Sequence, residues 1–396
     1  MGAKKASEFG VDDFVDAALD AAVQHFGIEK CYAAADHTRT FTGIHIPPLC
    51  LQWLIESNIW PLGRVTQSGG QFGTQKSTFI FQLIKWYLDA GGMATLVDTE
   101  NKTSDTLLRS MIPPEYFDVE NPKHKRFQIF RAHTVNEWQQ MLTKRQQLLQ
   151  EFVEKRGRKP NFPSIWAVDS MRGATSEEGL AQIQDTGEAG GRGYSDIPIL
   201  ISQFMGAIPD TLLGLPVTLH MSHHEKPAIG GQGMTRAGGK APDFYATLDI
   251  QFKRGGVSAM GKSMEFSRVA YQAKNITLCV RKSSMGSDVD KEMTVAFCWR
   301  HDEGNKQVSW WDWDAATAML LAKKSTQLKD ILDINSTAKQ IVGEVFWSDT
   351  LGIKSADALP AREFGALIEA NAELKLKISD ALHIQQYKVF DGEMAS

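Results

Sequence analysis

The feature that most constrains this chain is a glycine-rich octapeptide, Gly70-Gln71-Phe72-Gly73-Thr74-Gln75-Lys76-Ser77. It follows an apolar run at 62–66, typical of a buried strand, and it opens the segment 77–90, whose apolar residues recur with helical spacing. A strand, a glycine-rich loop and a helix that begins with Lys-Ser form the arrangement that wraps nucleotide phosphates. The octapeptide therefore predicts a phosphate-binding loop, with an ordinary glycine-rich turn as the alternative.

One position departs from the phosphate-binding pattern G-x-x-x-x-G-K-[ST]. Gly70, Lys76 and Ser77 match it, but Gln75 stands in the place of the second glycine. Because glycine avoids crowding where the backbone approaches a phosphate, we expect Gln75 to point away from the nucleotide or to reshape the loop. The departure bears more on catalysis than on fold.

Composition allows an α/β core and excludes some classes of function. The chain has 396 residues, of which 42% are hydrophobic and 23% charged, enough for one main domain with smaller terminal pieces. A net charge of −4 excludes a globally basic nucleic-acid binder, so any such contact needs a local patch. No apolar run approaches the roughly 20 residues of a membrane span. Four scattered cysteines without a CxxC predict buried thiols in a reducing cytoplasm.

Strand-like and helix-like segments alternate along the middle of the chain. The strand-like runs are 93–97, 164–168, 217–221, 246–253 and 276–280, and an amphipathic helix is expected at 135–153. This alternation predicts an α/β fold with a mostly parallel twisted sheet covered by helices on both faces.

The two ends of the chain differ from this middle part. The apolar residues of 11–26 share one helical face, and from about residue 316 the pattern turns helical again. We therefore expect three parts: 1–45 as an N-terminal helix and linker, 46–315 as the core, and 316–396 as a small, mainly helical C-terminal domain.

Acidic residues at strand ends complete a candidate catalytic set. Phosphoryl transfer to water needs charge neutralisation, a metal and a group that polarises the attacking water. Lys76 would neutralise the β- and γ-phosphates, and Ser77 with Asp169 would hold Mg²⁺. Glu100 would polarise the water, unless it only caps the next helix. Asp98 is a weaker competitor for that role.

Two adjacent histidines follow the predicted strand 217–221. A metal site needs three or four ligands, and no further ligand stands at useful spacing from His223 and His224. Because His223 lies just past a core strand, it is a candidate sensor of the γ-phosphate. A plain solvent-facing loop histidine is the alternative.

The glycine-rich segment 226–242 is a candidate nucleic-acid-binding loop, with a flexible linker as the alternative. It has no acid before residue 243 and could order around a phosphate backbone, with its apolar residues against unstacked bases. The candidate contact residues are Lys226, Ile229, Met234, Arg236 and Lys240. A second glycine-rich segment, 182–196, carries Arg192 and is likewise a candidate nucleic-acid-binding loop.

Taken in order, these features resemble the RecA-type strand-exchange recombinases, and especially their bacteriophage UvsX-like members. Residues 17–27 resemble the family's polymerisation helix, and Leu62-Gly63-Arg64-Val65 its lead-in to the phosphate-binding loop. Asp98-Thr99-Glu100 is similar to the strand with the catalytic glutamate, and Val168-Asp169-Ser170 to the Walker B strand. The resemblance implies a RecA-like P-loop ATPase core.

The resemblance also implies roles for the remaining segments. Segment 182–196 corresponds to the first DNA-binding loop and 226–242 to the second, whose G-G-x-A-x-x-F-Y exit matches 238–245. His223 falls at the polar γ-phosphate sensor, and Arg281 or Lys282 where cations cross the filament interface to a neighbour's ATP. From the residues alone, these two cations read as solvated surface charges. The family's adenine-stacking aromatic has no clear counterpart near 104–107.

The function implied is an ATP- and Mg²⁺-dependent DNA recombinase. Such a protein forms a head-to-tail filament on single-stranded DNA and pairs it with homologous duplex DNA, helped by a single-strand-binding protein or mediator. The expected location is the cytoplasm of a bacterium or a phage-infected host. The alternatives are another RecA-fold motor, such as a hexameric helicase, and a non-catalytic filament that coats single strands, which Gln75 favours.

Overall fold

The chain divides into two units, Met1–Thr40 with Ala395–Ser396, and Phe41–Met394, and the description below concerns the second. The computed structural model describes residues 41–392 except for 158–159, 172–175, 187–190, 213, 228–233, 237–240, 256–263, 267–268, 287–288, 290, 303 and 340–342. In the first unit, only residues 21 and 24 are described, and both are helical. The predicted helix at 11–26 otherwise lies outside the described residues.

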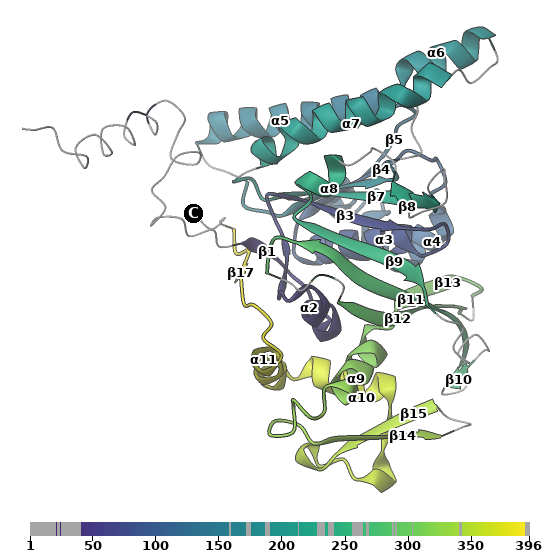
Figure 1. The fold of residues 1–396 in the computed structure, drawn as a ribbon, viewed down its shortest axis with the longest axis vertical. Helices are drawn as coiled ribbons and strands as arrows, with labels where there is room; N and C mark the ends of the chain where they lie inside the picture. The colour runs from purple at the N-terminus through teal and green to yellow at the C-terminus, as the bar shows by residue number, and fades with distance from the viewer. Residues whose placement is uncertain are drawn as a thin grey trace, which may run out of the picture. The chain divides into compact units, whose positions relative to one another are not determined.

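A large mixed sheet forms the centre of this unit (Figure 1). Its strands lie in the order β13-β12-β11-β9-β3-β7-β6-β4-β5. Their bounds are β3 (Arg64–Gly70), β4 (Met93–Asp98), β5 (Phe127–Arg131), β6 (Ser164–Asp169), β7 (Val217–Pro227), β9 (Leu248–Arg254), β11 (Val269–Ser283), β12 (Glu292–His301) and β13 (Gln307–Trp311). Two short strands extend it: β8 (Met234–Arg236) pairs with β7, and β10 (Met264–Phe266) with β11.

The prediction of a mostly parallel sheet in an α/β fold is confirmed. All neighbours from β9 to β5 are parallel, whereas β9, β11, β12 and β13 pair antiparallel. The sequence predicted a strand at 276–280, but β11 is far longer, because it pairs with β9 and β12 along most of its length. Side-chain periodicity could not reveal that extension, since pairing depends on distant partners.

Helices cover both faces of the parallel part. The helices of this part are α3 (Lys76–Asp89), α4 (Asp105–Met111), α5 (Val135–Arg156), α6 (Glu177–Thr186), α7 (Gly191–Leu212) and α8 (Ala241–Tyr245). Along β6, Ile165 and Ala167 belong to the core cluster around α3, while Trp166 and Val168 belong to the cluster around α5 and α7. Alternate residues of a strand face opposite sides, so a near-continuous apolar strand buries both faces.

The segment 182–196, predicted as a loop, is instead mostly helical. Helix α6 ends at Thr186 and α7 begins at Gly191. Ile201, Met205, Ile208 and Leu212 recur with helical spacing along α7 and are buried in the core cluster around α5 and α7. This packing stabilises a long helix and outweighs the poor helix propensity of the glycines at its start.

The C-terminal part combines helices with a small sheet. Its elements are α9 (Trp313–Lys323), β14 (Ile334–Lys339), β15 (Gly343–Ser348), β16 (Leu359–Pro360), α10 (Ala361–Ala370), α11 (Ala372–Ala381) and β17 (Lys388–Val389). The expected helices are present, but the antiparallel sheet β14-β15-β16 was not predicted. Phe346 of this sheet packs with Phe364 and Leu49, so the small sheet shares a core with the helices.

The end of the chain returns to the beginning of the described unit. Strand β17 pairs with β1 (Thr42–His45), which pairs with β2 (Ile59–Pro61). The remaining elements are α2 (Leu49–Ile55) and the 3₁₀ helices η2 (Pro114–Tyr116), η3 (Pro122–Arg126), η5 (Asp349–Leu351) and η6 (Ser355–Asp357). Within the described parts of the chain, no helix is long and apolar enough to cross a membrane.

Candidate nucleotide-binding site

The octapeptide forms a tight loop between β3 and α3. A Cβ atom on Gly70 would lie 2.3 Å from the carbonyl oxygen of Phe252, so only glycine fits there. Gln75 has φ 65° and ψ 30°, in the left-handed region that favours glycine. The non-matching residue thus takes the backbone conformation that a glycine adopts without strain, and its side-chain Oε1 lies 3.4 Å from the Thr78 hydroxyl.

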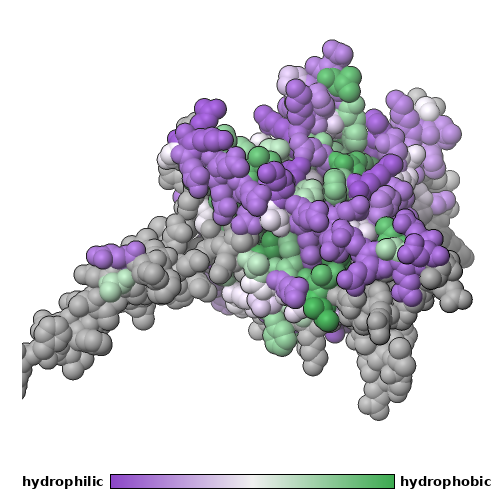
Figure 2. All heavy atoms as spheres, turned by 90° about the horizontal axis from the view of Figure 1, so that it is seen from above, coloured by the Kyte–Doolittle hydropathy of each residue, from purple (hydrophilic) through white to green (hydrophobic). Residues whose placement is uncertain are grey.

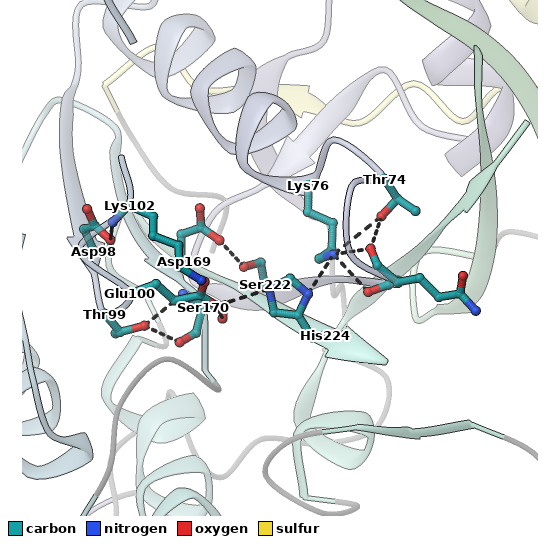
Figure 3. Close-up of polar contacts among 12 residues, drawn as sticks. Thr74, Lys76, Asp98, Thr99, Glu100, Lys102, Asp169, Ser170, Ser222 and His224 are labelled. Carbon is teal, nitrogen blue, oxygen red and sulfur yellow. Dashed lines mark hydrogen bonds and ion pairs between the residues drawn. The ribbon is translucent and has the colours of Figure 1, made fainter. Parts of the chain in front are cut away.

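Lys76 is folded back onto the loop that it follows (Figure 3). Its Nζ donates to the carbonyl oxygens of Gly70 and Gln71, both at 2.9 Å, and lies 3.4 Å from Nδ1 of His224. Burial lowers the pKa of Lys76 to about 8, although Asp169, Glu225 and Glu100 oppose this shift. The ammonium group therefore occupies carbonyl acceptors that a bound phosphate would replace.

Glu100 is held by three donors at the end of β4. Its Oε1 accepts from Ser170 Oγ at 2.6 Å and from His224 Nε2 at 3.1 Å, and its Oε2 lies 2.9 Å from Lys102 Nζ. The hydrogen bond from His224, followed by those from Ser170 and Lys102, holds the pKa of Glu100 well below its usual range. Glu100 is therefore an ionised carboxylate at neutral pH, as a group that orients water must be.

His224 connects the lysine to the glutamate. A carboxylate can only accept and an ammonium group can only donate, so the contacts assign the proton of a neutral His224 to Nε2. Its ring also stacks on Phe72 of the loop, with ring centroids 6.3 Å apart. His224 thus contacts Phe72 of the octapeptide loop, Lys76 and Glu100.

The sequence had singled out His223 for this place. Side chains alternate along β7, so Ser222 and His224 face the pocket while His223 lies on the opposite face, fully buried. Sequence reasoning could not choose between the neighbours, because the face that each presents depends on the register of β7 with β3.

Asp169 is partly buried at the end of β6. Ser222 Oγ donates to its Oδ1 at 2.6 Å. Burial raises the pKa of Asp169, and hydrogen bonds from Ser222 and Ser77 partly offset this. A carboxylate and a hydroxyl on one wall suit Mg²⁺, which is usually held by one or two carboxylates together with phosphates and water. Among the residues that are described, no group of three His, Cys, Asp or Glu could hold a metal ion by itself. A Mg²⁺ site that shares its ligands with phosphates and water does not require such a group.

Asp98 and Thr99 support this wall. Asp98 is buried and accepts from the backbone N–H groups of Lys102 at 3.3 Å and Thr103 at 3.0 Å. The Thr99 hydroxyl accepts from the Ser170 N–H at 2.9 Å. Asp98 therefore orders the loop after β4, which accounts for it without a catalytic role.

These groups surround a cavity of about 240 Å³ at the carboxyl ends of the parallel strands. Its lining is Phe72, Gly73, Thr74, Gln75, Lys76, Ser77, Thr78, Phe81, Asp98, Glu100, Lys102, Thr103, Ser104, Leu107, Asp169 and His224. The predicted set Lys76, Ser77, Glu100 and Asp169 is therefore brought together from β4, β6 and the loop before α3. Open α/β sheets bind ligands at this edge.

Two cations that the sequence did not single out contact the octapeptide loop from outside the cavity. Arg254 Nη2 donates to the carbonyl oxygen of Phe72 at 3.1 Å, and Lys274 Nζ donates to that of Gly73. They lie at the end of β9 and within β11. No motif surrounds them, so the pairing of β9 with β3 and β11 was needed to find them.

The other predicted residues lie outside this cavity. Arg281 pairs with Glu225, and Lys282 donates to backbone carbonyls of α8. Lys226 lies in β7, Met234 and Arg236 in β8, and Arg192 in α7. Ile229 and Lys240 lie outside the described residues. The segment 226–242 is thus partly ordered as an antiparallel pair, in which Glu225 lies opposite Arg236.

Comparison with models of known protein families and with curated proteins gives no match.

Proposed function

We propose that the chain is an ATP-dependent DNA recombinase that forms a filament on single-stranded DNA and pairs it with homologous duplex DNA. The observation that carries the nucleotide part is the chain of contacts Lys76–His224–Glu100, which joins the phosphate-binding loop to a candidate general base. The DNA part rests on the order of motifs that resembles the RecA-type family.

In this proposal each pocket residue has one task. Lys76 would leave the carbonyls of Gly70 and Gln71 and donate to the β- and γ-phosphates. Ser77 and Asp169 would hold Mg²⁺, which supplies charge neutralisation for the transferred phosphoryl group. Glu100, an acceptor at neutral pH, would orient the attacking water and take its proton.

His224 would report the state of the pocket to the segment that follows β7. When Lys76 turns to a phosphate, the 3.4 Å contact with His224 Nδ1 would be lost, and the imidazole could then change its partners. The backbone of β7 continues from His224 into segment 226–242, which we propose contacts DNA together with Arg192 of α7. Nucleotide binding and DNA binding would then shift one shared equilibrium.

Filament formation has a candidate surface on α5. A groove of about 750 Å³ between α5 and the sheet is mostly apolar, with Met141, Leu149 and Phe130 in its lining. Viewed from above, on the side where α5 and α7 lie, the surface is largely hydrophilic and carries separate hydrophobic patches (Figure 2). We propose that the apolar face of segment 11–26 from a second copy occupies this groove, giving head-to-tail assembly.

The second candidate function is a filament that coats single strands without catalysis. Gln75 favours it. Its backbone is left-handed, and the residue lines the cavity where a nucleotide would bind. Titration with a fluorescent ATP analogue separates the two candidates, since the coating filament predicts little or no binding.

The deciding experiment is joint-molecule formation between a single strand and supercoiled duplex DNA, with ATP and Mg²⁺. We expect product with homologous duplex and none with heterologous duplex, and loss of product in Lys76→Ala. Tight single-strand binding without product would contradict the recombinase and support the coating filament or a motor.

Glu100→Gln separates catalysis from binding. Removing a general base costs typically about 10²- to 10⁴-fold in turnover, so ATPase kcat should fall by that range while the analogue still binds. Glu373→Gln on α11, an exposed glutamate that pairs with Lys377 and lies outside the pocket lining, is the matched control. Turnover retained in Glu100→Gln would reject Glu100 as the base.

A further inference from the structure

Arg281 and Lys282, adjacent at the end of β11, contact groups of their own chain on either side of segment 226–240. Arg281 Nη1 donates to Glu225 Oε1 at 2.9 Å, and Glu225 directly precedes the segment. Lys282 Nζ donates to the carbonyl oxygens of Asp243 at 2.7 Å and Phe244 at 2.6 Å in α8, which directly follows it. Two neighbouring cations therefore contact both ends of one segment.

A β-bulge gives Arg281 its reach. Strand β11 pairs with β9 in regular register up to Val280 opposite Ile250, and the next pair is Lys282 opposite Asp249. Arg281 is the extra residue, and bulges commonly redirect a side chain. The guanidinium consequently extends past β9 and β3 to Glu225 on β7.

Gly69 of β3 lies between the strands that carry Gln251 and Glu225. Gln251 of β9 and His223 of β7 stand on either side of Gly69, which has no side chain. Gln251 Nε2 crosses over it and donates to Glu225 Oε2 at 2.7 Å. Both carboxylate oxygens of Glu225 are thus engaged by strands that lie beyond β3.

The pairing of Arg281 with Glu225 matters because the carboxylate is buried. The Glu225 side chain is 2% exposed, whereas that of Arg281 is 39% exposed. A buried carboxylate requires charged or polar partners, so removing the guanidinium should weaken the hold on Glu225. At the other end, Lys282 donates to two carbonyl oxygens in the last turn of α8, where a helix has no donors of its own to offer.

The same strand links this cluster to the nucleotide pocket. His224 and Glu225 are neighbours on β7 that face opposite sides of the sheet, one toward Lys76 and Glu100, the other toward Arg281. The position of Glu225 along the sheet therefore sets that of His224 as well.

We propose that Arg281 and Lys282 are positioning residues that fix the two ends of segment 226–240 on the core sheet within one chain. Arg281 acts through Glu225 at the start of the segment, and Lys282 through α8 at its end. We call these contacts of Arg281 and Lys282 with Glu225 and α8 the clamp. Its link to nucleotide and DNA binding rests on the proposed function, whereas the contacts themselves do not.

Limited trypsin digestion of the full-length, nucleotide-free protein tests the clamp directly. Trypsin cuts after Arg236 and Lys240, and the products are read by mass spectrometry; Lys226 precedes Pro227 and is not a trypsin site. We expect cleavage there to rise about tenfold in Arg281→Met, since losing a charged hydrogen bond favours local opening. Lys253→Met, which removes a β9 cation that pairs with Glu292 on β12, should leave cleavage at the wild-type rate.

Further variants guard against a general loss of structure. Glu225→Gln keeps a similar shape but removes the charge, and Lys282→Met releases the other end, so both should also raise cleavage. The charge swap Glu225→Arg with Arg281→Glu should restore cleavage after Arg236 and Lys240 toward the wild-type rate; the new site at residue 225 is scored separately. Wild-type cleavage in Arg281→Met and Lys282→Met would overturn the proposal.

Repeating the digestion with a bound ATP analogue distinguishes the clamp from the role expected from the sequence, in which Arg281 or Lys282 contacts a neighbour's ATP. If the clamp couples pocket and segment, the ATP analogue changes the cleavage pattern of the wild type but not of Arg281→Met, which still binds the analogue. Reduced analogue affinity with unchanged nucleotide-free cleavage would overturn the clamp and support contact with a neighbour's ATP. Failure of the wild type to bind the analogue would contradict the proposed function and leave the nucleotide-free test intact.

Discussion

Gln75 shows how a residue that breaks a motif can still preserve its backbone. The loop needs a left-handed residue immediately before Lys76, and Gln75 supplies it at φ 65°. For a residue with a Cβ atom, that conformation costs roughly 1–2 kcal/mol. Thr78 is the one neighbour near the Gln75 amide among its described contacts, at 3.4 Å, which is too long to offset this cost.

Gln75→Gly should therefore stabilise the protein. Relief of the left-handed strain exceeds the added flexibility of glycine in the unfolded chain, for a net gain of about 1 kcal/mol in unfolding free energy. Urea denaturation should show a higher midpoint with an unchanged slope. Gln75→Ala keeps the strained conformation and should show no gain. Equal midpoints for the alanine and glycine variants would contradict the argument.

Lys76 should make nucleotide binding depend on pH in the mildly alkaline range. Its pKa is lowered to about 8, so the free protein loses the ammonium proton as the pH rises through that value. Affinity for an ATP analogue should then fall by up to about tenfold per pH unit above 8. Fluorescence titrations from pH 7 to 9.5 measure this. Lys76→Met should bind weakly at every pH, and an equal decline in that variant would assign the effect to another group.

At the scale of elements, a polar ladder joins β3 to β7 beneath the pocket. His220 lies opposite Thr66 in the parallel register, and its two ring nitrogens lie 2.9 Å from Thr66 Oγ1 and 3.1 Å from Ser68 Oγ. Ser68 leads directly into the glycines of the loop. Two strands that carry opposite walls of the pocket are thus joined by one fully buried imidazole.

This histidine should make folding sensitive to acid. Burial lowers the pKa of His220 to about 3, while the unfolded chain titrates near 6.5, so between these values only the unfolded state takes up the proton. The stabilisation is complete above pH 6.5 and is lost as the pH falls toward 3, by about 1.4 kcal/mol per unit. Urea denaturation at pH 7, 6 and 5 should show a steeper decline for the wild type than for His220→Gln. Parallel declines would exclude His220 as the source.

At the scale of the whole described unit, the last strand closes the fold. Asn58 and Tyr387 exchange hydrogen bonds, from Asn58 Nδ2 to the Tyr387 carbonyl at 3.1 Å and from the Tyr387 N–H to Asn58 Oδ1 at 2.8 Å. The Tyr387 hydroxyl donates to the Met285 carbonyl at 2.7 Å, and Ile384 is buried. The chain end therefore ties the β1–β2 pair to the loop after β11.

Removing this end should destabilise the core far from it. A chain ending at Ala381 exposes apolar core and leaves Asn58 without these two partners, for a loss of about 3 kcal/mol or more. Thermal denaturation followed by circular dichroism should show a lower Tm, with earlier loss of β-sheet signal. A chain ending at Gly392 keeps every contact named above and should melt like the full chain. Equal Tm values for both truncations would show that the return strand contributes little.

The sequence by itself determined the local features, because they depend on neighbours along the chain. Residues within a few positions of each other set three such features. These are the octapeptide between a strand and a helix, the acids at the ends of β4 and β6, and the alternation of strands and helices that predicts a mostly parallel sheet. These were enough to name Lys76, Ser77, Glu100 and Asp169 as one set. They were also enough to predict the α/β fold.

Only the tertiary structure decided what depends on pairing across the sheet. The register of β7 with β3 placed His224 rather than His223 in the pocket, since a shift of one residue reverses the face. Packing of α7 against α5 stabilised a helix that begins at Gly191, within a segment predicted as a loop. The bulge in β11 brought Arg281 to Glu225, 56 residues away in the chain. No local pattern encodes such contacts, because their energy arises from burial and from partners that meet only in the folded chain.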